Sequence, residues 1–271
     1  MREFIAAISG YYVQMGKAAT NLLRASVLAL LCLVPALPST ATSAVALRSR
    51  YRVVLAADSR AVYGAGHNAT ECKLFEVGSA YATVSGLAHY GSRYHAMDAV
   101  RDAYSHPGTF QERVADTASS LQNRVGSLLA YLARNNPSQF RLLTRKANPH
   151  SDIVALAIAE SVAGQPMLGV IELRRTNNGS LVAQTSICPG NCRQGDGLFY
   201  LGYWDQIRPY VANDGQPRSV GSAASIDRLI RLEINAHPDE VGTPINILEL
   251  NGTGARWLQN GGNCSLPNVG W

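Results

Sequence analysis

Short segments of apolar residues, separated by polar ones, predict β-strands in the first part of the chain. Residues 42–47 and 52–57 are rich in Val, Leu and Ala, which predicts a hairpin buried on at least one face. Residues 73–77 and 81–85 predict a second pair of strands, joined by a Gly-Ser turn. The polar, glycine-containing stretch between the two pairs predicts a loop.

Two amphipathic helices are predicted after these strands. Residues 87–105 have apolar positions at helical spacing and are followed by a His-Pro-Gly sequence, in which Pro and Gly stop a helix. Residues 110–134 carry an apolar stripe at the same spacing. That stripe consists of Val114, Ala118, Leu121, Val125, Leu128, Leu129 and Leu132. Residues 135–150 are polar and predict a loop.

The second half of the chain predicts strands, one helix and a last pair of strands. The helix covers residues 219–236. The strands comprise residues 152–160, 166–174, 180–188, 243–250 and 255–258. The sequence has no repeat of fixed period and no linker, so we expect one layered α/β domain over residues 42–260, with two sheets between helices.

Residues 1–41 differ from the rest of the chain. Lys17 and Arg24 precede an apolar run from Ala25 to Leu37, and a tract of small residues follows. This order is typical of a secretory signal peptide, and the run is shorter than the roughly 18 residues that a membrane span needs. We therefore expect a signal peptide over residues 1–41, a domain over residues 42–271, and a secreted or periplasmic protein. An uncleaved N-terminal anchor is the alternative, and the leader would be the only part to contact a membrane.

Composition and charge limit the classes of partner. Hydrophobic residues make up 46% of the chain and charged residues 16%, which is typical of a globular protein. The formal net charge is +5, but part of it lies in the leader and the remaining Arg residues are scattered. We therefore expect no nucleic-acid partner.

Four cysteines remain beyond the leader: Cys72, Cys188, Cys192 and Cys264. An even number suits an oxidising compartment, and four cysteines allow three pairings, which the sequence leaves open. Cys188 and Cys192 are close enough in sequence to close a small loop. No second Cys or His pair lies at ligand spacing, so we expect no metal site, and we expect no organic cofactor.

Three sequence blocks carry the candidate chemistry, while the serine-hydrolase elbow, the P-loop and the zinc-protease motif are absent. The blocks are VVLAADSRA (53–61), CKLFE (72–76) and YATVSGLA (81–88). Their order resembles the N-terminal half of proteasome β-type subunits, where a strand, Asp-Ser-Arg, a loop, Lys, a strand and Ser-Gly follow one another. The resemblance points to the bacterial proteasome-like branch, and it implies a four-layer αββα sandwich of the N-terminal-nucleophile hydrolase type.

The resemblance also assigns roles to residues of this chain. In the family a catalytic threonine begins the mature chain sixteen residues before the aspartate, which leads from Asp58 to Thr42. Thr42 would be the nucleophile, with its own α-amine as the base. Lys73 would favour the deprotonated forms and Asp58 would orient it. The Gly86 N–H would stabilise the oxyanion.

Cleavage of the leader would expose the nucleophile. Signal peptidases favour small residues one and three positions before the cut, and Ser39-Thr40-Ala41 satisfies this rule for cleavage before Thr42. A cut after Ala44 satisfies the rule too and would remove the nucleophile. We favour the first cut because of the spacing from Thr42 to the aspartate and lysine.

The match is weaker after residue 90. The family's Gly-Ser-Gly turn and Asp-x-x-Ser-Gly-Gly segment correspond to residues 202–204 and 238–243, with Tyr203 and Val241 in place of the serines. Asp239 is the expected acidic residue of the second segment, one position out of register. By resemblance, Val84 would face the pocket for the substrate residue on the acyl side of the cut.

The resulting functional hypothesis is a secreted threonine-type peptidase or amidase that hydrolyses amide bonds through an acyl-enzyme, acting on a peptide or small amide. A non-catalytic proteasome-like assembly or binding protein is the alternative from another class. A small-amide hydrolase of the wider N-terminal-nucleophile group is the third. By resemblance only, the chain would form a homo-oligomeric ring.

Overall fold

The structure is a computed structural model that describes residues 42–63, 67–144, 152–176, 178–192, 197–213, 222–262 and 264. The predicted signal peptide lies outside the described residues. None of the described helices is both long and apolar enough to cross a membrane.

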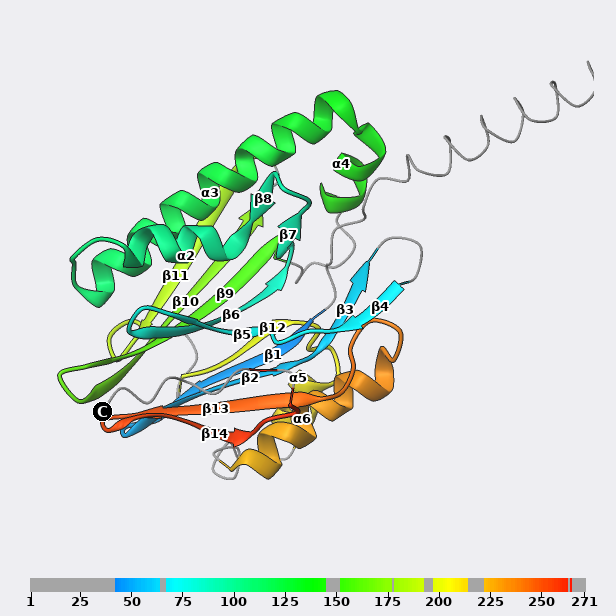
Figure 1. The fold of residues 1–271 in the computed structure, drawn as a ribbon. Coiled ribbons are helices and arrows are strands. Elements are labelled where there is room, and N and C mark those ends of the chain that lie inside the picture. The colour runs from blue at the N-terminus through cyan, green and yellow to red at the C-terminus, as the bar shows by residue number, and fades with distance from the viewer. Residues whose placement is uncertain are drawn as a thin grey trace, which may run out of the picture. The chain divides into compact units, whose positions relative to one another are not determined.

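The described strands form two five-stranded antiparallel sheets and two short hairpins (Figure 1). The first sheet has the order β12 (Leu198–Gly202), β1 (Ser43–Arg48), β2 (Arg52–Asp58), β13 (Ile245–Asn251), β14 (Gly254–Gln259). The second has the order β11 (Leu181–Cys188), β10 (Gln165–Arg175), β9 (Val154–Val162), β6 (Ala80–Gly86), β5 (Leu74–Val77). The hairpins pair β3 (Arg60–Tyr63) with β4 (His67–Thr70) and β7 (His89–Tyr90) with β8 (Tyr94–His95).

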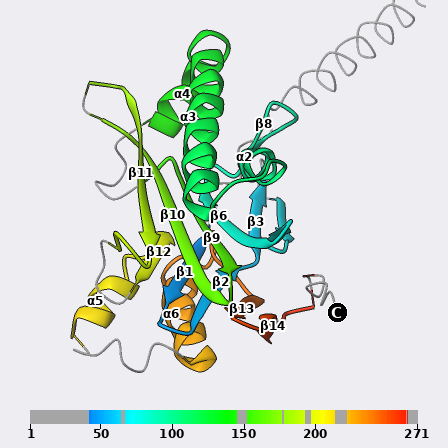
Figure 2. The same cartoon turned by 90° about the vertical axis from the view of Figure 1, so that its left-hand side faces the viewer.

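Helices pack on both sheets. Helices α2 (Ala96–Tyr104) and α3 (Phe110–Asn135) cover the second sheet, and α4 (Pro137–Thr144) follows α3 (Figures 1 and 2). Helices α5 (Ile207–Asn213) and α6 (Ala223–Ala236) lie against the first sheet. Three clusters of buried apolar residues result: one under α2 and α3, one between the sheets, and one under α6. The predicted mixture of two sheets and flanking helices is therefore confirmed as a mixed α/β fold.

The apolar pattern explains the helix and strand contacts. The predicted stripe of α3 is buried, and its Thr109 N-cap forms a capping box with Glu112. On β9, residues from Val154 to Glu160 are buried on both faces, because helices cover one face and the other sheet covers the second.

The structure corrects several sequence expectations. The helix predicted from residue 87 begins only at Ala96, and residues 89–95 form the β7–β8 hairpin. Gly91 adopts φ 51° in this hairpin, and His95 then caps α2 by accepting from the Met97 N–H. The predicted loop after β2 contains the β3–β4 hairpin, and the loop after α3 contains α4. Strand β12 and helix α5 had no sequence prediction. Residues 214–221, at the predicted start of α6, lie outside the described residues.

Candidate active site

A buried ion pair lies where the two sheets meet. Asp58 is the last residue of β2, and Lys73 directly precedes β5. Lys73 Nζ donates to both carboxylate oxygens of Asp58, at 3.0 and 3.1 Å. The two side chains are 9% and 0% exposed. Because β2 and β5 belong to different sheets, the pair connects the sheets beside the start of β1.

Three backbone N–H groups also bind the Asp58 carboxylate. The Ser43 N–H donates to Oδ1 at 2.9 Å, and the Arg60 and Gly242 N–H groups donate to Oδ2 at 3.0 and 3.1 Å. Each donor comes from a different part of the chain, so the carboxylate joins β1, β3 and the turn that precedes β13. Hydrogen bonds to the ionised form favour it and fix its orientation.

Thr42 lies beside this ion pair. It directly precedes Ser43, whose N–H shares the Oδ1 atom of Asp58 with Lys73 Nζ. Thr42 is only 4% exposed, and its carbonyl accepts a hydrogen bond from the Tyr203 N–H at 2.9 Å. The fold therefore brings the start of β1 within two hydrogen bonds of the lysine ammonium group.

Gly202, the last residue of β12, permits this close approach. Its φ is 77°, and a Cβ atom at this position would lie 1.9 Å from the Thr42 carbonyl oxygen and 3.1 Å from Ser85 Cβ. Any side chain would displace one of these neighbours, and the positive φ strains all residues except glycine. The glycine thus lets β12, Thr42 and Ser85 meet.

Gly86 ends β6 on the side of the second sheet. Its φ is 75°, and a Cβ atom would lie 2.5 Å from the Ile153 carbonyl oxygen. The preceding Ser85 is 1% exposed, and its hydroxyl donates to the Ala155 carbonyl at 3.4 Å. The contact between Ser85 and Gly202 places the end of β6 alongside Thr42.

Burial opposes the charges of the ion pair. Removal from water lowers the pKa of Lys73, against the raising effect of the Asp58 carboxylate. Removal from water likewise raises the pKa of Asp58, against the lowering effects of Lys73 and of the Ser43 and Gly242 N–H groups. Burial thus disfavours the charged form of Lys73, while the Asp58 carboxylate and its hydrogen bond favour that form.

The two remaining candidate residues lie away from the ion pair. Asp239 is exposed in the turn after α6, and among the described residues no hydrogen bond or ion pair joins its side chain to Asp58 or Lys73. The site contact from this turn is the Gly242 N–H instead. Val84 is 3% exposed and packs in the cluster under α2 and α3, on the face of β6 opposite Ser85.

A group of titratable side chains behind Tyr203 had no sequence prediction. The Tyr203 ring lies 4.4 Å from the His237 ring, between centroids. His237 Nε2 is 3.7 Å from an oxygen of Glu233, whose other oxygen accepts from the Gln206 and Ile207 N–H groups. Burial raises the pKa of Glu233. The spacing of Glu233 and His237, one helical turn apart, was the available signal for their contact.

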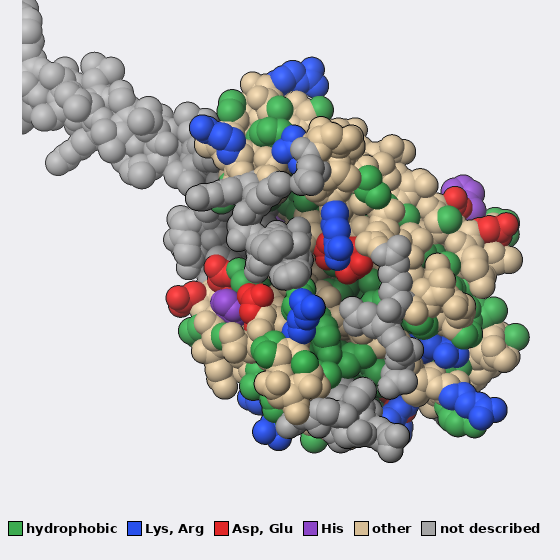
Figure 3. Space-filling view, turned by 180° about the vertical axis from the view of Figure 1, so that it is seen from behind, with side chains coloured by type: hydrophobic (Ala, Val, Ile, Leu, Met, Phe, Trp, Pro, Cys, Tyr) green, Lys and Arg blue, Asp and Glu red, His purple; other side chains and the backbone are tan. Residues whose placement is uncertain are grey.

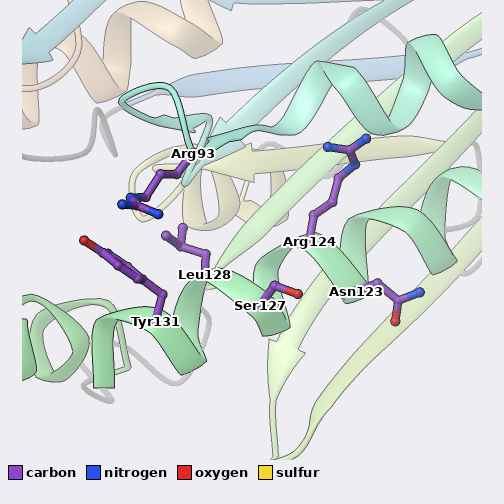
Figure 4. Close-up of a pocket in the computed structure, with 6 residues that line it drawn as sticks. All are labelled: Arg93, Asn123, Arg124, Ser127, Leu128 and Tyr131. Carbon is purple, nitrogen blue, oxygen red and sulfur yellow. The ribbon is translucent and has the colours of Figure 1, made fainter. Parts of the chain in front are cut away.

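A groove between the β7–β8 hairpin and α3 is separate from this site (Figure 4). It has a volume of about 330 Å³ and shares no residue with the ion pair. Arg124 in its wall pairs with Asp102 at 2.6 Å, and Arg93 lies 4.1 Å from the Tyr131 ring centroid. Arg124 thus has an ion-pair partner and Arg93 lies over an aromatic ring, and we assign the groove no catalytic role.

Metal ligands and charge patches do not define another site in the described part of the chain. The described residues contain no group of three or more His, Cys, Asp or Glu side chains that could hold a metal ion. On the face in Figure 3, the basic side chains are dispersed among neutral ones. The arrangement around Asp58 and Lys73 is therefore the candidate site for chemistry by protein groups.

The disulfides resolve the cysteine pairing that the sequence left open. Cys72 pairs with Cys264, and Cys188 pairs with Cys192. The corresponding Cα–Cα distances are 5.0 and 5.2 Å, within the range that disulfides require. The cysteines are thus compatible with an extracellular protein.

Comparison with known proteins supports the fold. No protein-family model matches the chain, and no curated protein matches its sequence. An Anbu mutant from Hyphomicrobium sp. strain MC1 superposes with a TM-score of 0.52 at 15% identity, over 80% of this chain and 87% of that one. An Anbu complex from Pseudomonas aeruginosa, solved as a helical assembly, gives a TM-score of 0.50 at 18% identity, over 77% and 81% of the chains.

A third Anbu, from Yersinia bercovieri, is described as an ancestral beta-subunit. It gives a TM-score of 0.48 at 13% identity, over 76% of this chain and 81% of that one. The first two similarities establish a proteasome-like fold for this chain. At these identities they show the fold alone.

Proposed function

We propose that this chain is a secreted or periplasmic threonine peptidase or amidase, with the four-layer αββα architecture of N-terminal-nucleophile hydrolases. The observation that supports it most strongly is the Asp58–Lys73 ion pair, whose Oδ1 atom also accepts the N–H of the residue after Thr42. Cleavage before Thr42 creates the free α-amine. The two disulfides and the proteasome-like fold support the same proposal.

The reaction is acyl transfer to the Thr42 hydroxyl. The α-amine of Thr42 accepts the hydroxyl proton while Oγ1 attacks the carbonyl carbon of an amide. The Gly86 N–H stabilises the oxyanion, and Lys73, oriented by Asp58, stabilises the developing negative charge. The tetrahedral intermediate expels the amine, which takes up the proton, and water then hydrolyses the Thr42 ester. Val84, expected from the resemblance to face the acyl-side pocket, packs under α2 and α3 instead, so we assign it no substrate contact. Asp239 belongs to the turn that carries Gly242.

The test has two parts. The mass of the intact secreted protein must correspond to a chain that starts at Thr42. A panel of fluorogenic peptides and small amides must then show hydrolysis that Thr42→Ser retains and Thr42→Ala abolishes. A mature chain that starts at Val45, or equal hydrolysis by the Ala variant, contradicts the proposal.

A second function, assembly or binding without catalysis, is favoured by Tyr203 and Val241, which stand where the family has serines. The helical assembly of the Pseudomonas aeruginosa Anbu complex supports a homo-oligomer for this chain as well. Native mass spectrometry of the secreted protein measures its oligomeric state. An oligomer that retains the leader and shows no hydrolysis favours this second function.

A further inference from the structure

The residue before Lys73 carries a long-range covalent link. Cys72 bonds to Cys264, which is 192 residues away in the sequence. The segment that contains Glu71, Cys72 and Lys73 belongs to no strand; it runs from β4 to β5. The Glu71 N–H donates to the carbonyl of Ser59, the residue after β2, at 2.8 Å. The disulfide is thus the covalent restraint next to the lysine.

The other end of the disulfide is anchored beside Asp58. Cys264 lies in the segment after β14, where the Gly261 N–H donates to the Asn246 side chain at 2.8 Å. The Asn246 amide in turn donates to the Ser59 hydroxyl at 2.7 Å. Asn246 is 1% exposed and belongs to β13, the strand paired with β2. The C-terminal segment is therefore fixed to the sheet that holds Asp58.

The disulfide and the ion pair consequently connect the same two parts of the molecule: the segment between β4 and β5, and the first sheet with the segment that follows β14. Lys73 bonds to Asp58 across the sheets, and Cys72 bonds across them to Cys264. Lys73 carries its ammonium group on a flexible four-carbon side chain, so a displacement of its backbone moves that group relative to Asp58. The second disulfide lacks this relation, because Cys188 and Cys192 close a local loop at the end of β11.

We propose that the Cys72–Cys264 disulfide is a positioning element for Lys73, which holds the ammonium group on Asp58 and thereby makes Thr42 chemistry depend on an oxidised C-terminal segment. This inference rests on the proposed function. Cys72 and Cys264 themselves are positioning residues and touch no reacting atom. In a reducing environment, a dithiol would transfer two electrons and two protons to the disulfide, giving two protein thiols and the cyclic disulfide of the reagent.

The test compares two double variants that each remove one disulfide. We expect Cys72→Ser/Cys264→Ser to lower kcat for amide hydrolysis at least tenfold, with KM changed less than twofold, and to shift the alkaline limb of the kcat pH profile. The matched control, Cys188→Ser/Cys192→Ser, should change kcat less than twofold. Circular dichroism, at a temperature well below the unfolding midpoint of each variant, verifies that both are folded.

A chemical readout separates the positioning role from the proposed activity. An amine-selective acylating reagent, with peptide mapping by mass spectrometry, should modify Lys73 at least fivefold faster in Cys72→Ser/Cys264→Ser than in wild type. The control variant should react at the wild-type rate. If the wild-type protein hydrolyses no amide, the proposed function fails, whereas the labelling of Lys73 still tests the positioning role.

A reversible experiment covers the case in which the first variant does not fold. In the Cys188→Ser/Cys192→Ser protein only the Cys72–Cys264 disulfide remains, and mild treatment with dithiothreitol reduces it. We expect kcat to fall and Lys73 labelling to rise on reduction, and both to recover on reoxidation. Unchanged kcat together with unchanged labelling, in the folded variant or after verified reduction, overturns the proposal.

Discussion

Removing one charge of the buried Asp58–Lys73 pair should destabilise the protein far more than removing one charge of an exposed pair. Lys73→Met keeps the volume of the lysine stem but leaves the Asp58 carboxylate buried with backbone donors only. Removal of one partner of a buried ion pair costs about 3–5 kcal/mol, against a total stability of about 5–15 kcal/mol for a typical domain. Asp58→Asn leaves a buried ammonium group and should cost a similar amount.

The double variant Asp58→Asn/Lys73→Met removes both charges. Its free energy of unfolding should therefore fall by at least about 2 kcal/mol less than the two single variants' decreases added together. Urea unfolding of the purified protein at pH 7 measures all four free energies of unfolding. The exposed pair Asp98–Arg101, whose side chains are 42% and 54% exposed, is the control, with an expected coupling of about 0–1 kcal/mol.

The pH dependence of stability gives a further check on the same set of variants. Without Lys73, burial raises the pKa of Asp58 above its unfolded value, so the protonated folded form is favoured at low pH. The loss of unfolding free energy caused by Lys73→Met should therefore decrease as the pH falls. It should increase as the pH rises through the raised pKa of Asp58. Single losses below about 1 kcal/mol that simply add in the double variant would refute the reasoning.

Two substitutions and one titration test other parts of the structure. Gly202→Ala should cost more than the 1–2 kcal/mol or so of left-handed strain, because its Cβ atom must also displace the Thr42 carbonyl; urea unfolding measures it. Burial raises the pKa of Asp152 to about 6. Its contribution to stability should therefore be present below about pH 4 and lost as the pH rises through 6. Carboxyl NMR titration measures this pKa. Thr109→Ala removes the capping box with Glu112 and should cost about 1 kcal/mol in urea unfolding.

Each of the two substitutions has a matched comparison, and the titration has a contradicting outcome. Gly78 has φ 59°, and a Cβ atom added there would have no neighbouring atom within 4 Å, so Gly78→Ala should show the strain alone. Equal losses for Gly78→Ala and Gly202→Ala would contradict the proposed close approach. A carboxyl pKa near 4 would contradict the burial of Asp152. Thr109→Ser keeps the hydroxyl and should retain most of the stability that the Ala variant loses.

Local sequence pattern predicted the elements whose burial is set by their own residues. Helix α3 and strands β9 and β10 have long apolar stripes or runs, and their bounds match the predictions to within about two residues. Strand β12 was missed because it is short and becomes a strand only by pairing with β1, more than a hundred residues away. The β7–β8 hairpin was predicted as helix because a single glycine, here Gly91, is tolerated within a helical pattern and so did not exclude a helix.

In the site, too, the sequence predicted the side chains but not the backbone contacts that only the folded chain creates. The Asp58–Lys73 pair was predicted from spacing and resemblance, and the structure brings the two residues together. Their backbone donors Ser43, Arg60 and Gly242 could not be predicted, because any residue supplies an N–H and only the folded chain selects which one. The cysteine pairing was open for the same reason.

Backbone contacts also bear on residues 203 and 241, where the resemblance to proteasome β-type subunits leads us to expect serines. Tyr203 stands at one serine position, and its N–H binds the Thr42 carbonyl, so that anchoring needs no hydroxyl. Val241 stands at the other, and the next N–H, from Gly242, binds the Asp58 carboxylate. A backbone donor persists through any side-chain change except proline, provided that the turn keeps its path. The Tyr203 and Gly242 N–H groups therefore hold the start of β1 and the Asp58 carboxylate without a side-chain hydroxyl. The Tyr203 ring packs against the His237 ring, which lies beside the buried Glu233.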